Sequence, residues 1–224
     1  MRVSASGKPW AQASKYGNVF ILCTGRCGST TFARACSHIS NFSSGHETRA
    51  RVVGRGRLDY PRRHIEADNR LTWLLGRLDA EYGDDAFYVL LTRDRNAVAE
   101  SFSQRAQMPE SIALAYRNSV LMNPGKPTLE TCHDLIDTVT ANVRSFLKDK
   151  THWMDFRMET AARDFPAFWR RIGAEGDFDA AMAEWSTLHN ASWRPEPVGF
   201  RGRLKNALRR AVRDPLRKTA GLIR

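Results

Sequence analysis

The chain has 224 residues, of which 42% are hydrophobic and 26% are charged. This composition is typical of a globular domain with a substantial core and fits poorly with intrinsic disorder. No stretch approaches the roughly 18 consecutive apolar residues of a membrane-spanning helix, and the first residues lack the apolar segment of a secretory signal. We therefore expect a cytoplasmic protein.

The net charge of +11 is concentrated at the C-terminal end. Residues 198–224 contain nine Lys or Arg and one acidic residue, and apolar residues alternate with the basic ones as in an amphipathic helix. We expect a domain over residues 1–197 and an accessory tail over residues 198–224. The tail suits an anionic membrane surface, to which the protein would be peripheral, or an acidic substrate. A solvated helix is the alternative, and nucleic acid is not an expected partner.

Short apolar runs alternate with helical patterns in the first half of the chain. Residues 18–24 (NVFILCT) and 86–92 (AFYVLLT) are rich in β-branched and aromatic residues and adjoin glycine-containing turns. Both are expected to be strands buried on two faces. Asp68 is expected to be the N-cap of a helix that carries four leucines at a helical period. The helices expected in this half cover residues 30–38, 69–82 and 96–104.

The second half continues the alternation. A longer helix with an apolar stripe is expected over residues 128–147, followed by a short strand over 152–156. Strands that alternate with helices indicate an α/β domain of three layers, with a mostly parallel central sheet between helices. Two more helices are expected, at residues 161–172 and 178–189.

The chain has four cysteines, Cys23, Cys27, Cys36 and Cys132. Their spacings match neither a C-x-x-C motif nor a metal-ligand pair with histidines, and a disulfide framework is not typical of a chain this long with so few cysteines. We expect buried, reduced thiols.

The first expected strand leads through a glycine-containing turn directly into a helix. The free N–H groups and the positive dipole at the start of a helix attract anions. Gly25 and Gly28 allow a close approach of the backbone to a ligand, and Arg26 adds a fixed cation. Hydroxyl residues then follow, so that the segment reads Thr24-Gly25-Arg26-Cys27-Gly28-Ser29-Thr30-Thr31.

This loop matches neither of two common nucleotide-binding fingerprints, because G-x-x-x-x-G-K-[ST] and G-x-G-x-x-G are both absent. It resembles instead the 5′-phosphosulfate loop of sulfotransferases that use 3′-phosphoadenosine-5′-phosphosulfate (PAPS). That pattern is a basic residue, a small residue, a glycine and then two or three hydroxyl residues. Residues 26–31 follow it, with Arg26 at the basic position as in the carbohydrate and tyrosyl-protein branches of the family.

A second motif strengthens the resemblance. The strand over residues 86–92 leads into Arg93, and Ser101 follows eight positions later in the next helix. The family's 3′-phosphate motif has this spacing. An arginine at the carboxyl end of a strand points into the crevice where α/β sheets bind ligands, and the serine can donate to the same phosphate. Two motifs in the right order are more specific than either alone.

The resemblance covers about residues 18–190 and implies a P-loop-like fold and an enzyme that moves a sulfuryl group from PAPS to an acceptor hydroxyl. It implies that Arg26 stabilises the leaving phosphate and that no metal is required. The family's C-terminal Arg-Lys-Gly motif has only a degenerate candidate here, at residues 200–206. Phe32 occupies the position of a tryptophan that stacks on adenine in many members, although a core role is an equal alternative.

The base that takes the acceptor's proton has two candidates. Glu47 and Arg49 match a Glu-Thr-Arg segment of tyrosyl-protein sulfotransferases, in which the glutamate is the base, so Glu47 is the first choice. A glutamate flanked by Arg49 and Arg51 would be ionised. His46 is the rival, because neutral imidazole suits this role near pH 7 and another branch of the family uses histidine.

The acceptor itself has no recognisable code in the sequence. A glycan, a lipid, a small molecule and a peptide all remain open, and the stretches 41–68 and 107–128 are the expected acceptor loops. Two rival functions also stay open. One is a P-loop phosphoryl-transfer enzyme, which needs a lysine at the phosphates and an acidic Mg²⁺ ligand. The other is a non-enzymatic polyanion- or membrane-binding protein. The arginines that could hold an acidic acceptor, or form a solvated loop, are Arg49, Arg51, Arg55 and Arg57.

Overall fold

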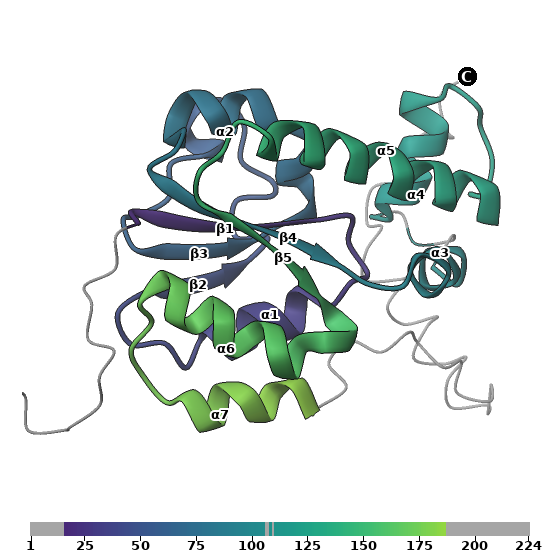
Figure 1. The fold of residues 1–224 in the computed structure, drawn as a ribbon. Helices are drawn as coiled ribbons and strands as arrows, with labels where there is room; N and C mark the ends of the chain where they lie inside the picture. The colour runs from purple at the N-terminus through teal and green to yellow at the C-terminus, as the bar shows by residue number, and fades with distance from the viewer. Residues whose placement is uncertain (1–15, 106–107, 109, 187–224) are drawn as a thin grey trace, which may run out of the picture. The chain divides into compact units, whose positions relative to one another are not determined.

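A parallel five-stranded sheet forms the centre of the protein, whose computed structural model describes residues 16–105, 108 and 110–186 (Figure 1). The strand order is β2-β3-β1-β4-β5. Central β1 pairs with β3 on one side and with β4 on the other, in register at Val19, Ile65 and Phe87. The strand bounds are β1 Asn18–Cys23, β2 Ser43–His46, β3 His64–Ala67, β4 Ala86–Thr92 and β5 Trp153–Arg157.

Helices cover both faces of the sheet, so the expected three-layer α/β architecture is confirmed. Figure 1 shows α1, α6 and α7 below the sheet, and α2 and α5 above it. The lower layer consists of α1 (Ser29–Cys36), α6 (Ala161–Ile172) and α7 (Phe178–Ala183). The other α-helices are α2 (Leu75–Tyr82), α3 (Arg95–Ser103), α4 (Ile112–Ala115) and α5 (Leu129–Leu147).

Local sequence signals account for most of these boundaries. Strand β1 is wholly apolar after Asn18, and all six of its residues are buried. Helix α3 begins after Asp94, whose side chain accepts from the N–H of Ala97, and α5 begins after Thr128, which accepts from the N–H of Thr131. Helix α6 ends at Gly173, which has a left-handed φ of 62°.

One expected helix is interrupted. Residues 69–82 form a 3₁₀ helix, η2 (Asn69–Trp73), and then α2, because Leu74 leaves the helical region at φ −123° and ψ 22°. Asp68 does cap the first of these, since its side chain accepts from the N–H of Arg70. The side chain of Thr72 donates to the carbonyl of Asn69, which favours the tighter 3₁₀ turn over a continuous helix.

The stretches expected to be loops contain several elements. Residues 41–68 hold β2, β3 and the 3₁₀ helix η1 (Arg55–Arg57). Residues 107–128 hold α4 and a π-helical turn, η3 (Tyr116–Val120). Helix α7 ends at Ala183, and a 3₁₀ turn, η5 (Glu184–Ser186), follows it, whereas 187–189 lie outside the described residues. One more 3₁₀ helix, η4 (Met158–Thr160), lies between β5 and α6.

All four cysteines are free and buried, as expected. Within the part of the chain that the structure describes, no helix has the length and apolar character needed to cross a membrane. The basic tail over residues 198–224 and the segment 200–206 lie outside the described residues.

Candidate functional site

The turn between β1 and α1 is built from left-handed residues. Gly25, Arg26 and Gly28 have φ values of 87°, 61° and 92°. A Cβ on Gly25 would lie 2.9 Å from Nδ2 of Asn69, and one on Gly28 would lie 3.1 Å from the sulfur of Met158. Gly28 is the N-cap of α1 and provides no side-chain cap, so the first N–H groups of α1 receive no capping bond from it. The turn therefore has the geometry of an anion-binding loop.

The two sequence motifs meet at this turn. Nε of Arg26 donates to Oγ of Ser101 over 2.9 Å, and Nη1 of Arg93 donates to the carbonyl oxygen of Arg26 over 3.3 Å. Arg93 follows the C-terminal end of β4, and Ser101 lies in the second turn of α3 and is buried. Residues that are 67 and 75 positions apart in sequence are thus in direct contact.

Positive charge accumulates around Arg26. Burial, and to a smaller extent the nearby charges of Arg105 and Arg93, lower the pKa of its guanidinium to about 10. Several positive charges close together in a partly buried region favour the binding of an anion, because the anion stabilises the charged form of each guanidinium. The local electrostatics around Arg26 therefore favour an anion over a cation.

The loop's side chains divide into two groups by exposure. Cys27 is fully buried, and its Sγ donates to the carbonyl oxygen of Gly25 over 3.3 Å, so its thiol is not exposed at the surface of the loop. Thr31 is also buried. The hydroxyls of Ser29 and Thr30 are on half-exposed residues at the start of α1 and can reach a ligand.

His46 lies against the start of α1. Its Nε2 is 3.0 Å from Oγ of Ser29 and 3.5 Å from Oγ1 of Thr30. His46 is the last residue of edge strand β2, so the parallel sheet places it at the same carboxyl edge as the turn between β1 and α1. The geometry makes this imidazole a hydrogen-bond partner of the loop hydroxyls.

Glu47 follows β2 directly and is half-exposed. Its Oε2 pairs with Nη1 of Arg70 over 2.7 Å, whereas Arg49, the neighbour in sequence, donates to the carbonyl of Gly56 and lies over the ring of Tyr60. The sequence suggested Arg49 as a charge partner of Glu47, but the partner in the structure is Arg70 of η2.

Backbone strain gathers at the same residues. Among the described residues, four that are not glycine have a left-handed φ, and they include Arg26 at 61° and Glu47 at 55°. Such conformations cost about 1–3 kcal/mol and cluster at functional sites. The residues proposed from the sequence as leaving-group cation and base are thus two of these four.

The basic run after Glu47 is not a uniform surface. Arg57 is buried, and its guanidinium pairs with the carboxylate of Asp68 and donates to the hydroxyl of Tyr60. It is therefore unavailable to an acidic acceptor. Arg51 and Arg55 are exposed, as is Val53 between them.

Phe32 belongs to the core rather than to an adenine site. It has no exposed surface, and its ring packs edge-on against four aromatic rings. The partners are Phe156, Phe165, Phe168 and Trp185.

Sequence reasoning missed three polar residues near the site. Asp68 is a charge partner as well as a cap, and Arg70 holds Glu47. Asn69 is nearly buried beside Gly25, and its Oδ1 is buried without a hydrogen-bond partner. All three follow the C-terminal end of β3, and the recognition of that strand would have found them.

A comparison of the chain with protein-family models finds no match, and a comparison with curated proteins finds none either.

Proposed function

We propose that the protein is a sulfotransferase that moves a sulfuryl group from PAPS to an acceptor hydroxyl. The observation that carries this proposal is the contact between the two motifs, in which Arg26, Arg93 and Ser101 meet at the turn before α1. A donor with phosphate groups at two positions needs two such anion sites side by side. The depressed pKa of Arg26, about 10, supports the assignment, because a bound anion relieves the repulsion that contributes to it.

In this proposal the phosphate loop binds the 5′-phosphosulfate. The backbone N–H groups of residues 26–29 and the hydroxyls of Ser29 and Thr30 donate to it, and Arg26 stabilises the charge that develops on the leaving phosphate. Arg93 and Ser101 hold the 3′-phosphate. The bound cofactor supplies the activated sulfuryl group, and these residues fit its two anionic groups without a metal ion.

The acid–base roles divide between His46 and Glu47. His46 contacts the loop hydroxyls, so we place it on the side of the leaving phosphate, where it orients Ser29. In an in-line transfer the acceptor hydroxyl lies on the opposite side of the sulfur atom. Glu47, oriented by Arg70 and half-exposed, is the proposed base on that side.

The acceptor is proposed to reach the site past the segment after Glu47. This segment exposes Arg51, Val53 and Arg55, and Val53 is 87% exposed. A surface of two cations and an apolar side chain fits an acidic acceptor better than a neutral one. A glycan, lipid, small molecule or peptide with a hydroxyl group meets this description, and the cytoplasm stays the proposed location.

Calorimetric titration of adenosine 3′,5′-bisphosphate (PAP), the desulfated product, tests the proposal in the absence of metal. We expect binding to the wild-type chain and a loss of roughly 10- to 100-fold in affinity in Arg93→Ala, since a charge-assisted hydrogen bond contributes about 1.5–3 kcal/mol. Arg95→Ala is the matched control, because Arg95 lies two residues away and pairs with Asp137 on the surface.

Two outcomes would contradict the proposal. Absence of PAP binding to a folded wild-type chain would exclude the cofactor, and nucleoside triphosphates with Mg²⁺ would be the next ligands. Equal losses in Arg93→Ala and Arg95→Ala would mean that PAP binds through general positive charge instead of through the two motifs.

A further inference from the structure

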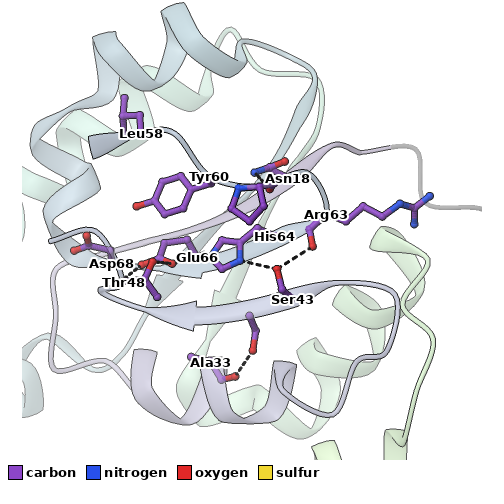
Figure 2. A network of polar contacts seen from close by, with 12 residues as sticks. Asn18, Ala33, Ser43, Thr48, Leu58, Tyr60, Arg63, His64, Glu66 and Asp68 are labelled. Carbon is purple, nitrogen blue, oxygen red and sulfur yellow. Dashed lines mark hydrogen bonds and ion pairs between the residues drawn. The ribbon is translucent and has the colours of Figure 1, made fainter. Parts of the chain in front are cut away.

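A buried carboxylate lies beneath the turn that carries His46 and Glu47. Glu66, in the middle of β3, has no exposed surface. Figure 2 shows its side chain next to that of His64, with Thr48 at one end of the group and Ser43 at the other. Oε1 of Glu66 accepts from the N–H of Thr48 over 2.7 Å, and Oε2 accepts from the hydroxyl of Thr48 over 2.7 Å. Nε2 of His64 lies 2.8 Å from Oε2.

This carboxylate is kept in its ionised form. Burial alone raises the pKa of Glu66, but the hydrogen bonds from His64 and Thr48 outweigh burial and leave the pKa below its ordinary value. An ionised carboxylate only accepts hydrogen bonds, so Nε2 of His64 is a donor here. On its other side, Nδ1 of His64 is 2.9 Å from Oγ of Ser43, and the imidazole stacks on the ring of Tyr60. The orientation of His64 is thereby fixed.

The bonds to Thr48 clamp the turn after β2 onto β3. Glu47 lies between two anchored groups, because its own N–H donates to the carbonyl of Ala67 and the next residue is held twice by Glu66. Its left-handed φ of 55° is a conformation that a free chain avoids at this residue. Strained conformations persist where the surroundings over-determine them, and this clamp is such a surrounding.

Gly45 completes the clamp. A Cβ at this position would lie 2.3 Å from Cγ2 of Thr48 and 2.9 Å from Oε2 of Glu66. The close approach of β2 to Glu66 is thus possible only with glycine at residue 45. The glycine on β2 and the glutamate on β3 therefore fit each other closely. A fortuitous hydrogen bond would not require such a fit.

We propose that Glu66, held by His64, is a positioning residue that fixes the turn bearing His46 and Glu47. It acts through Thr48 and does not touch the substrate. The naming of Glu47 as a base rests on the proposed function, whereas the clamp itself does not. A purely structural role for Glu66 predicts a loss of stability and nothing at Glu47, so the two explanations differ in a measurable way.

The test follows the backbone amide signals of the full chain by NMR. In the wild-type chain, the amide proton of Thr48 should shift as Glu66 is protonated, with a midpoint below the value of about 4.3 for a free glutamate. Glu66→Gln should abolish this titration and, at pH 7, displace the signals of His46 and Glu47. Thr48→Val should displace them as well, because it removes the hydroxyl donor, and Thr48→Ser should restore the wild-type positions.

Asp164→Asn is the matched control. Asp164 is another buried carboxylate that accepts from a backbone N–H, that of Arg157, and from a threonine hydroxyl, that of Thr160. It lies beside β5, at the other edge of the sheet, and its replacement should leave the signals of His46 and Glu47 unchanged.

The proposal is overturned if Glu66→Gln or Thr48→Val leaves Glu47 and His46 at their wild-type positions, or if Asp164→Asn displaces them equally. Addition of PAP to the same samples separates this result from the proposed function. If PAP shifts no signals of the wild-type chain, the sulfotransferase assignment fails, while the pH titration of Thr48 still decides whether the clamp exists.

Discussion

The two halves of the sheet achieve their burial by different means. Strands β1 and β4 are apolar and are followed by the glycine-containing turn before α1 and by Arg93, whereas β2 (SSGH) and β3 (HIEA) are short and contain several polar residues. All four residues of β3 are nevertheless buried, because the polar side chains bond to one another. The apolar half stabilises the fold by removing surface from water, and the polar half by satisfied hydrogen bonds that also fix orientation.

This difference corresponds to a division of labour in the proposed mechanism. The phosphate groups need a rigid frame and backbone N–H groups, which the apolar strands and the turn before α1 provide. A base needs a side chain that is held at a set angle, which the network under β2 provides. Substitutions in the two halves of the sheet should therefore change the free energy of unfolding by different amounts.

The largest effect is expected from the buried ion pair beside β3. Arg57→Ala should lower the free energy of unfolding by about 3–5 kcal/mol, because the fully buried carboxylate of Asp68 loses its closest cation and keeps only Arg70, whose Nη1 is 3.9 Å from Oδ1. Urea unfolding measures this loss. Arg55→Ala, which removes an exposed arginine of the same segment, should change stability by less than about 0.5 kcal/mol. A loss in Arg57→Ala as small as that control would show that the polar half is held mainly by its apolar contacts.

The sequence predicted the apolar half well for the same physical reason. Strands 86–92 and 18–24 are continuous apolar runs, so β4 matches its expected bounds and β1 lies within them. Arg26, Arg93 and Ser101 were selected because the segments that follow these two strands resemble the two phosphate motifs of PAPS-dependent sulfotransferases. Their contact in the structure follows from the adjacent, parallel pairing of β1 with β4.

The polar half was hidden from sequence reasoning. The segment His64–Ala67 (HIEA) alternates two polar residues with an isoleucine and an alanine, and this short pattern indicates a solvated loop unless the partners are known. Those partners, Ser43 and Thr48, are about 20 residues away in sequence. Only the pairing of β2 with β3 brings them together, so Glu66 could not be assigned a role beforehand.

A second prediction compares Gly45, which is crowded by neighbouring side chains, with Gly76, which is not. Gly45→Ala should lower the free energy of unfolding by about 1–3 kcal/mol, since the new methyl group collides with Thr48 and Glu66. Gly76→Ala, in α2, meets nothing within 4 Å and should raise stability by about 0.5–1 kcal/mol. Thermal or urea unfolding of both variants measures the difference in sign. A Gly45→Ala variant as stable as the wild-type chain would mean that β2 moves away from Glu66 at no cost.

The smallest effect isolates the strain at Glu47. Glu47→Ala and Glu47→Gly both remove the ion pair with Arg70 and differ only in backbone freedom. Because φ is 55° here, the glycine variant should be more stable than the alanine variant by about 1 kcal/mol, which urea unfolding can resolve. In an ordinary strand or helix the order is reversed, with glycine less stable by about 0.5–1 kcal/mol. If the glycine variant were instead less stable than the alanine variant, residue 47 would not have a left-handed φ in solution. In that case the turn would have no strained conformation for Glu66 to stabilise.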